Sequence, residues 1–182
     1  MCAPLCSQWP GSQRATARRR VRPRTPTRAA LQSAFGWTDA RYQSFLYTPL
    51  VGGPVQDLSG NKFYQTPRLQ ADLSASYHFP TSLGEVLLRA DYAWQDKIEF
   101  NVINDFNYQG AYGTANARVA LAGREKAWEL AVYGNNLADK HYAYTGGTLG
   151  APLSPIPTIA WNIPGPRRTV GLEGTYRWNP GR

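Results

Sequence analysis

LQADLSASYHF, residues 69 to 79, alternates between apolar and polar side chains along its whole length. Alternation with a period of two places every second side chain on the same side of an extended chain, whereas a helix would scatter these apolar residues around its circumference. The stretch therefore predicts a β-strand with one apolar and one polar face. The apolar face carries Leu69, Ala71, Leu73, Ala75, Tyr77 and Phe79.

The same pattern recurs in other parts of the chain. The clear runs are EVLLRADYAWQ (85–95), YGTANARVALA (112–122), AWELAVYGN (127–135) and RRTVGLEGTYRW (167–178), and a less regular run is SAFGWTDARYQSF (33–45). Two links are short, at 80–84 and 123–126, and three are long, at about 45–67, 96–111 and 136–166. Short and long links in alternation predict an all-β fold, an antiparallel up-and-down meander of about six strands with tight turns at one end and large loops at the other.

The positive charge of the chain is concentrated in its first 30 residues. The 182 residues include 20 Lys and Arg and 12 Asp and Glu, and residues 1–30 hold seven of the arginines and no acid, which leaves 13 basic against 12 acidic residues elsewhere. We expect residues 1–30 to be a disordered Pro/Arg-rich head, separate from the folded part at 31–182, because this composition buries too little apolar surface to order itself. Clustered arginine can bind nucleic acid, but the rest of the chain adds no basic face, so no nucleic-acid partner is expected.

The aromatic residues of the apolar faces gather near the strand ends. A soluble β-sandwich would place large aromatics at mid-strand, where burial is greatest. Membrane barrels instead carry aromatic belts at both lipid interfaces, with aliphatic side chains between them. If the short turns mark the periplasmic end, the sequence predicts a partial transmembrane β-barrel with interface aromatics Tyr77, Phe79, Trp128, Tyr176 and Trp178 at that end and Tyr92 and Trp94 at the other.

The opposite faces of the strands are strongly polar. They carry four carboxylates and four arginines, which we expect to pair across neighbouring strands in a wet interior. Arg168 is the one charge on the apolar faces of the five clear strands, and its position near a strand end lets it reach lipid headgroups. The polar-face charges are Asp72, Arg89, Asp91, Arg118, Glu129, Arg167, Glu173 and Arg177.

Residues 31 to 178 resemble the C-terminal end of the barrel of TonB-dependent outer-membrane receptors. The resemblance is carried by GWTDARY (36–42), DLSGNKFYQTPRLQADLSASYHF (57–79), LLRADYAWQDK (87–97), WELAVYGNNLADKHY (128–142) and VGLEGTYRW (170–178). The segment NNLADKHY is similar to a common signature of the family. In that family the last strand ends in an aromatic residue that the barrel-assembly machinery reads, and Trp178, with Tyr176 on the same face, matches that role.

The resemblance implies a place in the outer membrane of a Gram-negative bacterium and a part in TonB-dependent uptake of a siderophore-like or other scarce nutrient. It implies outer-membrane lipid, TonB, a plug, the remaining barrel strands and the barrel-assembly machinery as partners. Family barrels have about 22 strands around the plug, whereas about six strands are predicted here. We therefore expect a fragment, from a truncated gene product or a misassigned start, that is not active alone.

Specific chemistry is poorly represented in the sequence. The histidines are His78, on the polar face of a strand, and His141, at the base of a loop; no nucleophile elbow or metal-spaced cluster accompanies them. No enzyme activity, cofactor, catalytic residue or metal site is expected. In the long loops Tyr142, Tyr144 and Trp161 are able either to stack on a ligand or to pack the loop against itself. The alternative function is a soluble β-sandwich binding module with a basic nucleic-acid-binding arm.

Overall fold

The computed structural model describes residues 28–48, 54–104, 106–149 and 159–178. None of these residues belongs to a helix with the length and apolar character needed to cross a bilayer. They form the strands β1 (Ala29–Trp37), β2 (Leu46–Tyr47), β3 (Gln56–Asp57), β4 (Leu69–Pro80), β5 (Gly84–Gln95), β6 (Ile98–Glu99), β7 (Tyr108–Gln109), β8 (Tyr112–Gly123), β9 (Trp128–Asn135), β10 (Ala143–Leu149), β11 (Ile159–Pro164) and β12 (Thr169–Tyr176).

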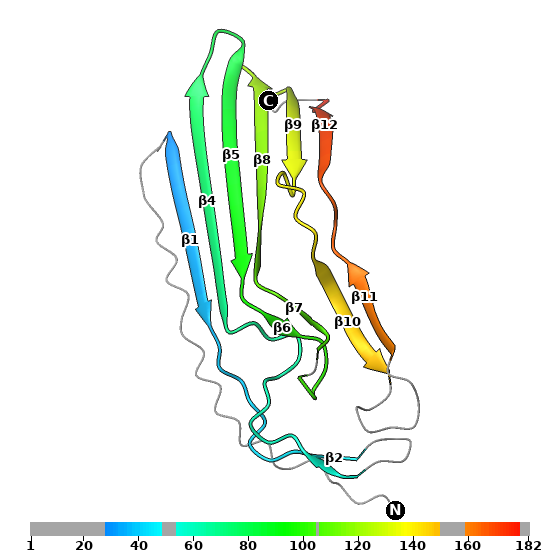
Figure 1. The fold of residues 1–182 in the computed structure, drawn as a ribbon. Coiled ribbons are helices and arrows are strands. Elements are labelled where there is room, and N and C mark those ends of the chain that lie inside the picture. Colours follow the sequence, from blue (N-terminus) through cyan, green and yellow to red (C-terminus); the bar gives the residue numbers. More distant parts are fainter. Residues whose placement is uncertain (1–27, 49–53, 105, 150–158, 179–182) are drawn as a thin grey trace, which may run out of the picture.

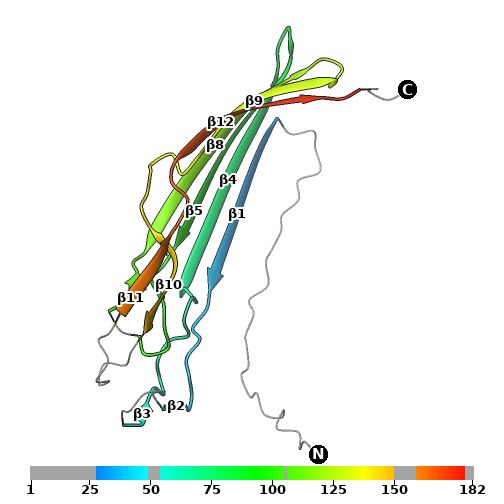
Figure 2. The ribbon, with the colours of Figure 1, turned by 90° about the vertical axis from the view of Figure 1, so that its right-hand side faces the viewer.

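Six of these strands form one antiparallel sheet in the order β1-β4-β5-β8-β9-β12 (Figure 1). Figure 2 shows that the sheet is a single curved layer. Each long strand pairs with the next long strand along the chain, which confirms the predicted up-and-down meander. Strands β4, β5 and β8 have 12 residues each, more than the roughly 9–11 residues that a tilted strand needs to cross a bilayer.

The register keeps the two faces of the sheet separate across all six strands. Tyr92 of β5 lies opposite Leu73 of β4 and Ala115 of β8. One position earlier, Asp91 lies opposite Ser74. Because side chains alternate along each strand, one side of the sheet is the apolar face and the other the polar face, as the sequence predicts.

The first strand differs from the prediction. The irregular run was expected at 33–45, but β1 spans Ala29–Trp37 and therefore begins inside the segment expected to be a disordered head. Beyond β1 the chain leaves the sheet, and Tyr42 packs against Phe45 and Phe63 with ring centroids 4.7 and 4.4 Å apart. Residues 1–27, which hold most of the basic arm of the alternative function, lie outside the described residues.

The tight turn between β4 and β5 depends on one glycine. The N–H of Thr81 donates to the carbonyl of Gly84 at 2.6 Å, and Gly84 has a φ of 153°. A Cβ at this position would overlap the carbonyl of Ala122 on β8. Only glycine therefore fits where the turn lies against the neighbouring strand.

The long links hold hairpins that were not predicted. Strands β2 and β3, β6 and β7, and β10 and β11 form three two-stranded sheets, and Figure 1 shows them at the end of the sheet opposite the short turns. The strands β2, β3, β6 and β7 have two residues each, too few for an alternation to be visible. In β10 and β11 the glycines and prolines of AYTGGTL and IAWNIP obscure the strand pattern.

The main sheet has no second layer among the described residues. Leu73, Leu88, Val132 and Leu172 on the apolar face are 47%, 40%, 49% and 84% exposed. A β-sandwich would cover these side chains with the inner face of a second sheet. The alternative of a sandwich fold is therefore wrong, and the structure is a segment of an open barrel wall.

Candidate functional site

Five of the predicted interface aromatics lie at the short-turn end of the apolar face. We call Tyr77, Phe79, Trp128, Tyr176 and Trp178 the short-turn belt. The rings of Tyr77 and Phe79 are 5.9 Å apart, and those of Tyr176 and Trp178 are 6.1 Å apart. Tyr176 lies opposite Trp128 in the register of β12 with β9. The positions agree with the prediction, while the roles of these residues at the lipid interface and in barrel assembly stay predictions.

Trp128 rests on the backbone of the neighbouring strand. A Cβ added to Gly123 of β8 would overlap the indole ring of Trp128, and one added to Gly113 would overlap the ring of Tyr92. Glycine at these two positions therefore lets each ring lie flat against the sheet.

A second aromatic group lies at the loop end of the apolar face. Tyr92 and Trp94 were predicted there, and the register adds Phe35 and Trp37 of β1. Ala71 of β4 lies opposite both Phe35 and Trp94, so these two rings flank it at the same level. Phe35 and Trp37 are 71% and 51% exposed. The sequence of β1 could have predicted this placement, because Phe35 and Trp37 are two positions apart and therefore lie on the same face of the strand.

The polar face carries an ion-pair network across three strands. Arg118 of β8 donates to Glu129 of β9 at 2.9 Å and to Glu173 of β12 at 2.6 Å. The predicted pairing across strands is therefore present at Arg118. The guanidinium of Arg118 therefore links the last strand, β12, to β8, although β9 lies between these two strands.

Other polar-face charges pair differently from the prediction. Arg89 and Asp91 pair along the same strand at 2.9 Å, and Asp91 also accepts from Ser74 at 2.6 Å. Asp72 and Arg177 have no ion-pair partner among the described residues.

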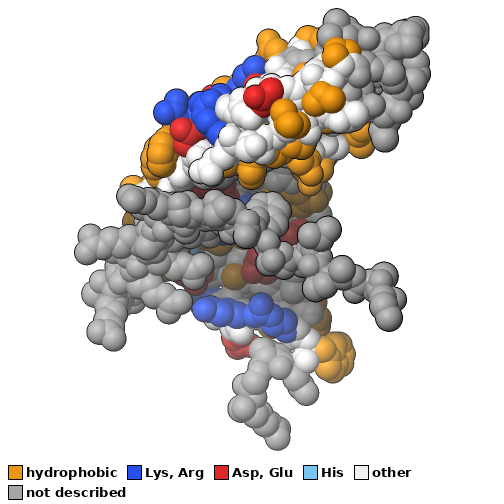
Figure 3. All heavy atoms as spheres, turned by 90° about the horizontal axis from the view of Figure 1, so that it is seen from below, with side chains coloured by type: hydrophobic (Ala, Val, Ile, Leu, Met, Phe, Trp, Pro, Cys, Tyr) orange, Lys and Arg blue, Asp and Glu red, His pale blue; other side chains and the backbone are white. Residues whose placement is uncertain are grey.

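The described loop residues of 38–68, 96–111 and 136–168, which we call the loop cap, contain most of the buried apolar side chains. Leu58, Ile98 and Phe100 are 6%, 6% and 4% exposed. The cap therefore has a small interior of its own. On its surface, basic and acidic side chains lie beside one another among the described atoms (Figure 3).

Side-chain amides join the three loops of the cap. Asn61 donates to the carbonyls of Val102 and Ile103 at 3.0 and 3.1 Å. Asn104 accepts from the N–H of Lys62 at 2.7 Å and donates to the carbonyl of the same residue at 3.0 Å. These bonds connect the first loop to the second without any sheet ladder between them.

The second loop is joined to the third in the same way. Asn107 donates to the carbonyl of Gly147 at 2.7 Å, and Asn101 donates to the hydroxyl of Thr148 at 3.0 Å. Asn107 is 4% exposed. Because buried amides cost free energy unless they are bonded, these contacts fix the loops relative to one another.

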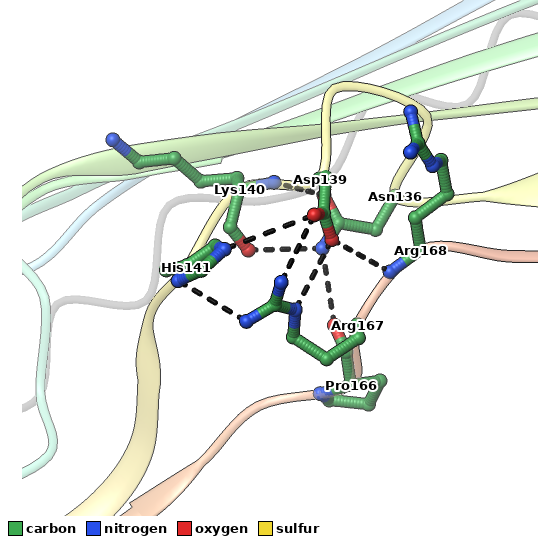
Figure 4. Close-up of polar contacts among 7 residues, drawn as sticks. All are labelled: Asn136, Asp139, Lys140, His141, Pro166, Arg167 and Arg168. Atoms are coloured by element: carbon green, nitrogen blue, oxygen red, sulfur yellow. Dashed lines mark hydrogen bonds and ion pairs between the residues drawn. The ribbon is translucent and has the colours of Figure 1, made fainter.

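The family-like segment NNLADKHY forms a junction between β9, the third loop and β12 (Figure 4). Asn136 is 4% exposed; it donates to the carbonyls of Lys140 and Pro166 at 2.9 and 3.0 Å and accepts from the N–H of Lys140 at 2.9 Å. Its φ of 48° lies in the left-handed region that asparagine tolerates. The segment is thus a structural junction.

A carboxylate completes this junction. Asp139 accepts from the backbone N–H of Arg168 at 3.1 Å and from the guanidinium of Arg167 at 3.0 Å. These two donors, the backbone N–H first, hold the pKa of Asp139 below its usual value. Arg167 therefore pairs within a loop junction and not across the sheet, while the side chain of Arg168 points away from the cluster (Figure 4).

The loop aromatics divide into packed and accessible rings. Tyr142 stacks on Tyr112 of β8 with centroids 4.3 Å apart, whereas Tyr144 and Trp161 are 69% and 44% exposed. Of the three rings considered for ligand stacking, Tyr142 is thus engaged with the wall and the other two are accessible.

Lys97 and Tyr108 present a second accessible arrangement. The ammonium of Lys97 lies 3.9 Å from the centre of the Tyr108 ring and 2.8 Å from a carboxylate oxygen of Glu99, whose side chain is 8% exposed. A buried carboxylate thus holds the lysine over the ring, an arrangement that stabilises the cation.

No catalytic arrangement involves the two histidines in the described parts of the chain. His78 bonds to Glu85 at 3.1 Å, and His141 bonds to Arg167 at 3.2 Å. No group of three or more His, Cys, Asp or Glu residues that could hold a metal ion occurs in those parts.

Comparison with known proteins identifies relatives of this fold. The family described as TonB dependent receptor-like, beta-barrel matches residues 19–137. The ferric yersiniabactin uptake receptor FyuA from Yersinia pestis is similar over 64% of this chain and 17% of its own, with 24% identity and a TM-score of 0.56. The siderophore receptor PiuA from Acinetobacter baumannii is similar over 81% of this chain and 19% of its own, with 18% identity and a TM-score of 0.62. The chain thus spans less than a fifth of either receptor, and no curated protein matches it in sequence.

Proposed function

The chain belongs to the family of TonB-dependent receptor-like β-barrels, and on that premise we propose that it supplies wall strands and external loops for the uptake of a siderophore-like nutrient. The family is one of non-enzymatic transport in the Gram-negative outer membrane. The observation that carries the proposal is the single-layer sheet, which exposes apolar side chains on one face and ion pairs on the other.

Two findings support a siderophore-like nutrient. One similar solved structure is a receptor for uptake of ferric yersiniabactin and the other is a siderophore receptor. In the loop cap, Tyr144, Trp161 and Tyr108 are exposed, which suits the stacking of a planar ligand group. The nutrient itself belongs to the proposal.

The partners and the organisation of the chain are also part of the proposal. We infer that the segment acts only within a complete barrel, together with a plug, further strands and TonB. Outer-membrane lipid contacts the apolar face, and the barrel-assembly machinery recognises Tyr176 and Trp178. The residues that precede Arg28 form a head separate from the barrel segment, which begins with β1 at Ala29.

A chimeric receptor tests the transport role. Residues 28–178 replace the corresponding strands of the Acinetobacter baumannii siderophore receptor, and growth under iron limitation is measured in cells with and without TonB. The proposal predicts growth with the receptor's own siderophore or a related one in TonB-containing cells only. Growth equal to that of cells without any receptor, with the chimera present in the outer membrane, would contradict it.

Localisation is tested separately on the chain itself. Directed to the periplasm of a Gram-negative host, it is expected in the outer-membrane fraction. The matched variant Tyr176→Ser/Trp178→Ser removes the proposed assembly signal without touching the polar face, and less of it is expected to insert. Equal insertion of both proteins would contradict the role assigned to this aromatic pair.

A further inference from the structure

The short-turn end of the polar face carries basic side chains without acidic partners. Arg28, Arg124, Lys126 and Arg177, which we call the basic rim, are exposed, and no described carboxylate forms an ion pair with them. They come from the start of β1, the turn between β8 and β9, and the end of β12. The rim therefore extends from one edge of the sheet to the other.

The backbone holds the outer members of the rim in place. The N–H of His78 donates to the carbonyl of Arg28 at 2.6 Å, and the N–H of Arg177 donates to the carbonyl of Ala127 at 2.7 Å. Arg28 is thus fixed beside β4, and Arg177 beside the turn that carries Lys126.

Two adjoining hollows open onto the rim. One of about 620 Å³ is lined by Arg28, Arg124 and Lys126, and one of about 270 Å³ is lined by Lys126 and Arg177. Both are also lined by His78 and Glu85, so they lie next to each other. The larger hollow is in the size range of binding sites, roughly 300–1,000 Å³.

The acidic residues of this region are mostly engaged. Glu85 bonds to His78 at 3.1 Å, and Glu129 bonds to Arg118 at 2.9 Å. Glu125 is exposed in the turn between Arg124 and Lys126. A bond to histidine does not by itself neutralise the charge of Glu85. The four rim cations therefore face two carboxylates that no arginine or lysine pairs with, Glu85 and Glu125, and they still outnumber them.

We propose that the basic rim binds an acidic polypeptide segment at the short-turn opening of the barrel. The proposal rests on the proposed function, which makes this end the periplasmic opening. The rim spans a sheet of six strands, a width of roughly 24 Å at about 4.8 Å per strand spacing. That width matches about seven residues of extended chain and exceeds the reach of a single phosphate.

The position of the hollows favours a polypeptide over lipid headgroups. His78, Glu129 and Thr175 in their lining belong to the polar face. At the same level the apolar face carries the short-turn belt, including Tyr77 and Tyr176. A lipid on the apolar face would meet these rings, whereas a chain inside the barrel opening would meet the rim.

A titration with a labelled acidic peptide tests the proposal. The full chain in neutral detergent micelles is titrated against fluorescein-labelled octaglutamate, with octaglutamine as the neutral probe, and anisotropy is recorded. Only octaglutamate is expected to bind, and binding is expected to weaken strongly between about 50 mM and 1 M salt because the contacts are exposed. The variant Arg124→Gln/Lys126→Gln should bind about fivefold more weakly.

The matched control removes the same two charge types at the loop end. Lys140→Gln/Arg168→Gln changes an exposed lysine and an exposed arginine and should bind like the unaltered chain. Arg124→Lys/Lys126→Arg should retain binding, which separates loss of charge from loss of folding. Equal affinity of the Gln variant and the unaltered chain, or an equal loss in the control, overturns the proposal.

A lipid arm distinguishes the competing partner. Retention of each variant on phosphatidylglycerol vesicles is measured beside the peptide titration. Loss of vesicle retention by Arg124→Gln/Lys126→Gln with unchanged octaglutamate affinity would assign the rim to headgroups and overturn the proposal. The localisation experiment tests the proposed function independently, because the micelle titration does not require insertion into the outer membrane.

Discussion

The barrel wall and the loop cap use the same chain in opposite ways. On the wall Leu172 is 84% exposed, and in the cap Phe100 is 4% exposed. The wall has backbone ladders and apolar side chains that nothing in the described structure covers. The cap has separate two-stranded hairpins in place of a continuous ladder, and its loops are joined by side-chain amides such as Asn61 and Asn104.

The difference shows which solvent each region is adapted to. Apolar surface is favourable where lipid surrounds it and costs about 25 cal/mol per Å² when it is left in water. The wall is therefore suited to hydrocarbon. Apart from one carboxylate oxygen of Glu99, the cap satisfies its described buried side-chain polar atoms internally. It also buries a small apolar interior, so it is suited to water.

The largest effect is expected from a charge placed on the apolar face of the wall. Leu88 lies in the middle of β5 on the apolar face, so Leu88→Arg should destabilise the chain in a bilayer by about 2–4 kcal/mol. Guanidinium titration in phosphatidylcholine vesicles, followed by tryptophan fluorescence, measures this loss. Leu83→Arg in the short turn, where the leucine is 67% exposed, is the control and should cost little. Equal losses would show that no bilayer covers the sheet.

A smaller loss is expected when the junction of the cap is broken. Asn136→Ala removes the donors to Lys140 and Pro166 and should destabilise the third loop by about 2 kcal/mol, because buried backbone groups lose their partners. Hydrogen exchange should rise in the cap and stay unchanged in the wall. The neighbouring Asn135→Ala, which removes only a 3.5 Å contact with Thr169, should change exchange little. Faster exchange in the wall would contradict the separation of the two regions.

The polar face should respond less than the junction. Arg118→Met removes the link between β8 and β12 and is expected to lower the denaturant midpoint modestly, because half-exposed ion pairs contribute little. The effect should shrink as salt rises. Arg89→Met removes a pair within one strand and should not loosen β12. If both variants loosened β12 equally, the network would not be what holds the last strand.

The smallest effect is a dependence on pH in the third loop of the cap. The pKa of Asp139 is lowered in the folded state, so its contribution to stability is present above the unfolded pKa of about 3.9 and is lost as pH falls through the folded pKa. Limited proteolysis of the third loop should therefore accelerate on acidification while the wall resists. Asp139→Asn should remove that dependence. If Asp139→Asn kept the same dependence of proteolysis on pH, another carboxylate would be responsible for it.

The wall was predictable from sequence because its pattern, the alternation of apolar and polar residues, is visible within each short segment. Leu69 to Phe79 alternate without exception, and the register preserves that alternation across β5 and β8. Strand β1 was misplaced because Ala29 and Ala30 carry no strong periodic signal. The short-turn belt and two members of the second aromatic group, Tyr92 and Trp94, were predicted from the positions of the rings at the strand ends. Phe35 and Trp37 were missed because they lie on the misplaced strand β1.

The cap was not predictable because its contacts are distant in sequence. Asn61 bonds across 41 residues to Val102, and Asn107 bonds across 40 residues to Gly147. An asparagine in a loop gives no sign of which carbonyl it will reach. The basic rim was missed for a similar reason, since only the order of the strands places Arg28 and Arg177 along the same end of the sheet, at its two opposite edges.

The rings that lie on glycine also mark the alignment of neighbouring strands. Tyr92 covers Gly113, and Trp128 covers Gly123. Sliding β8 by two residues against either partner would bring a residue with a Cβ beneath the ring and push the ring off the sheet. Each ring–glycine pair thus disfavours a wrong register while the strands pair during folding. A ring displaced from its glycine would be an early spectroscopic sign of a shifted strand.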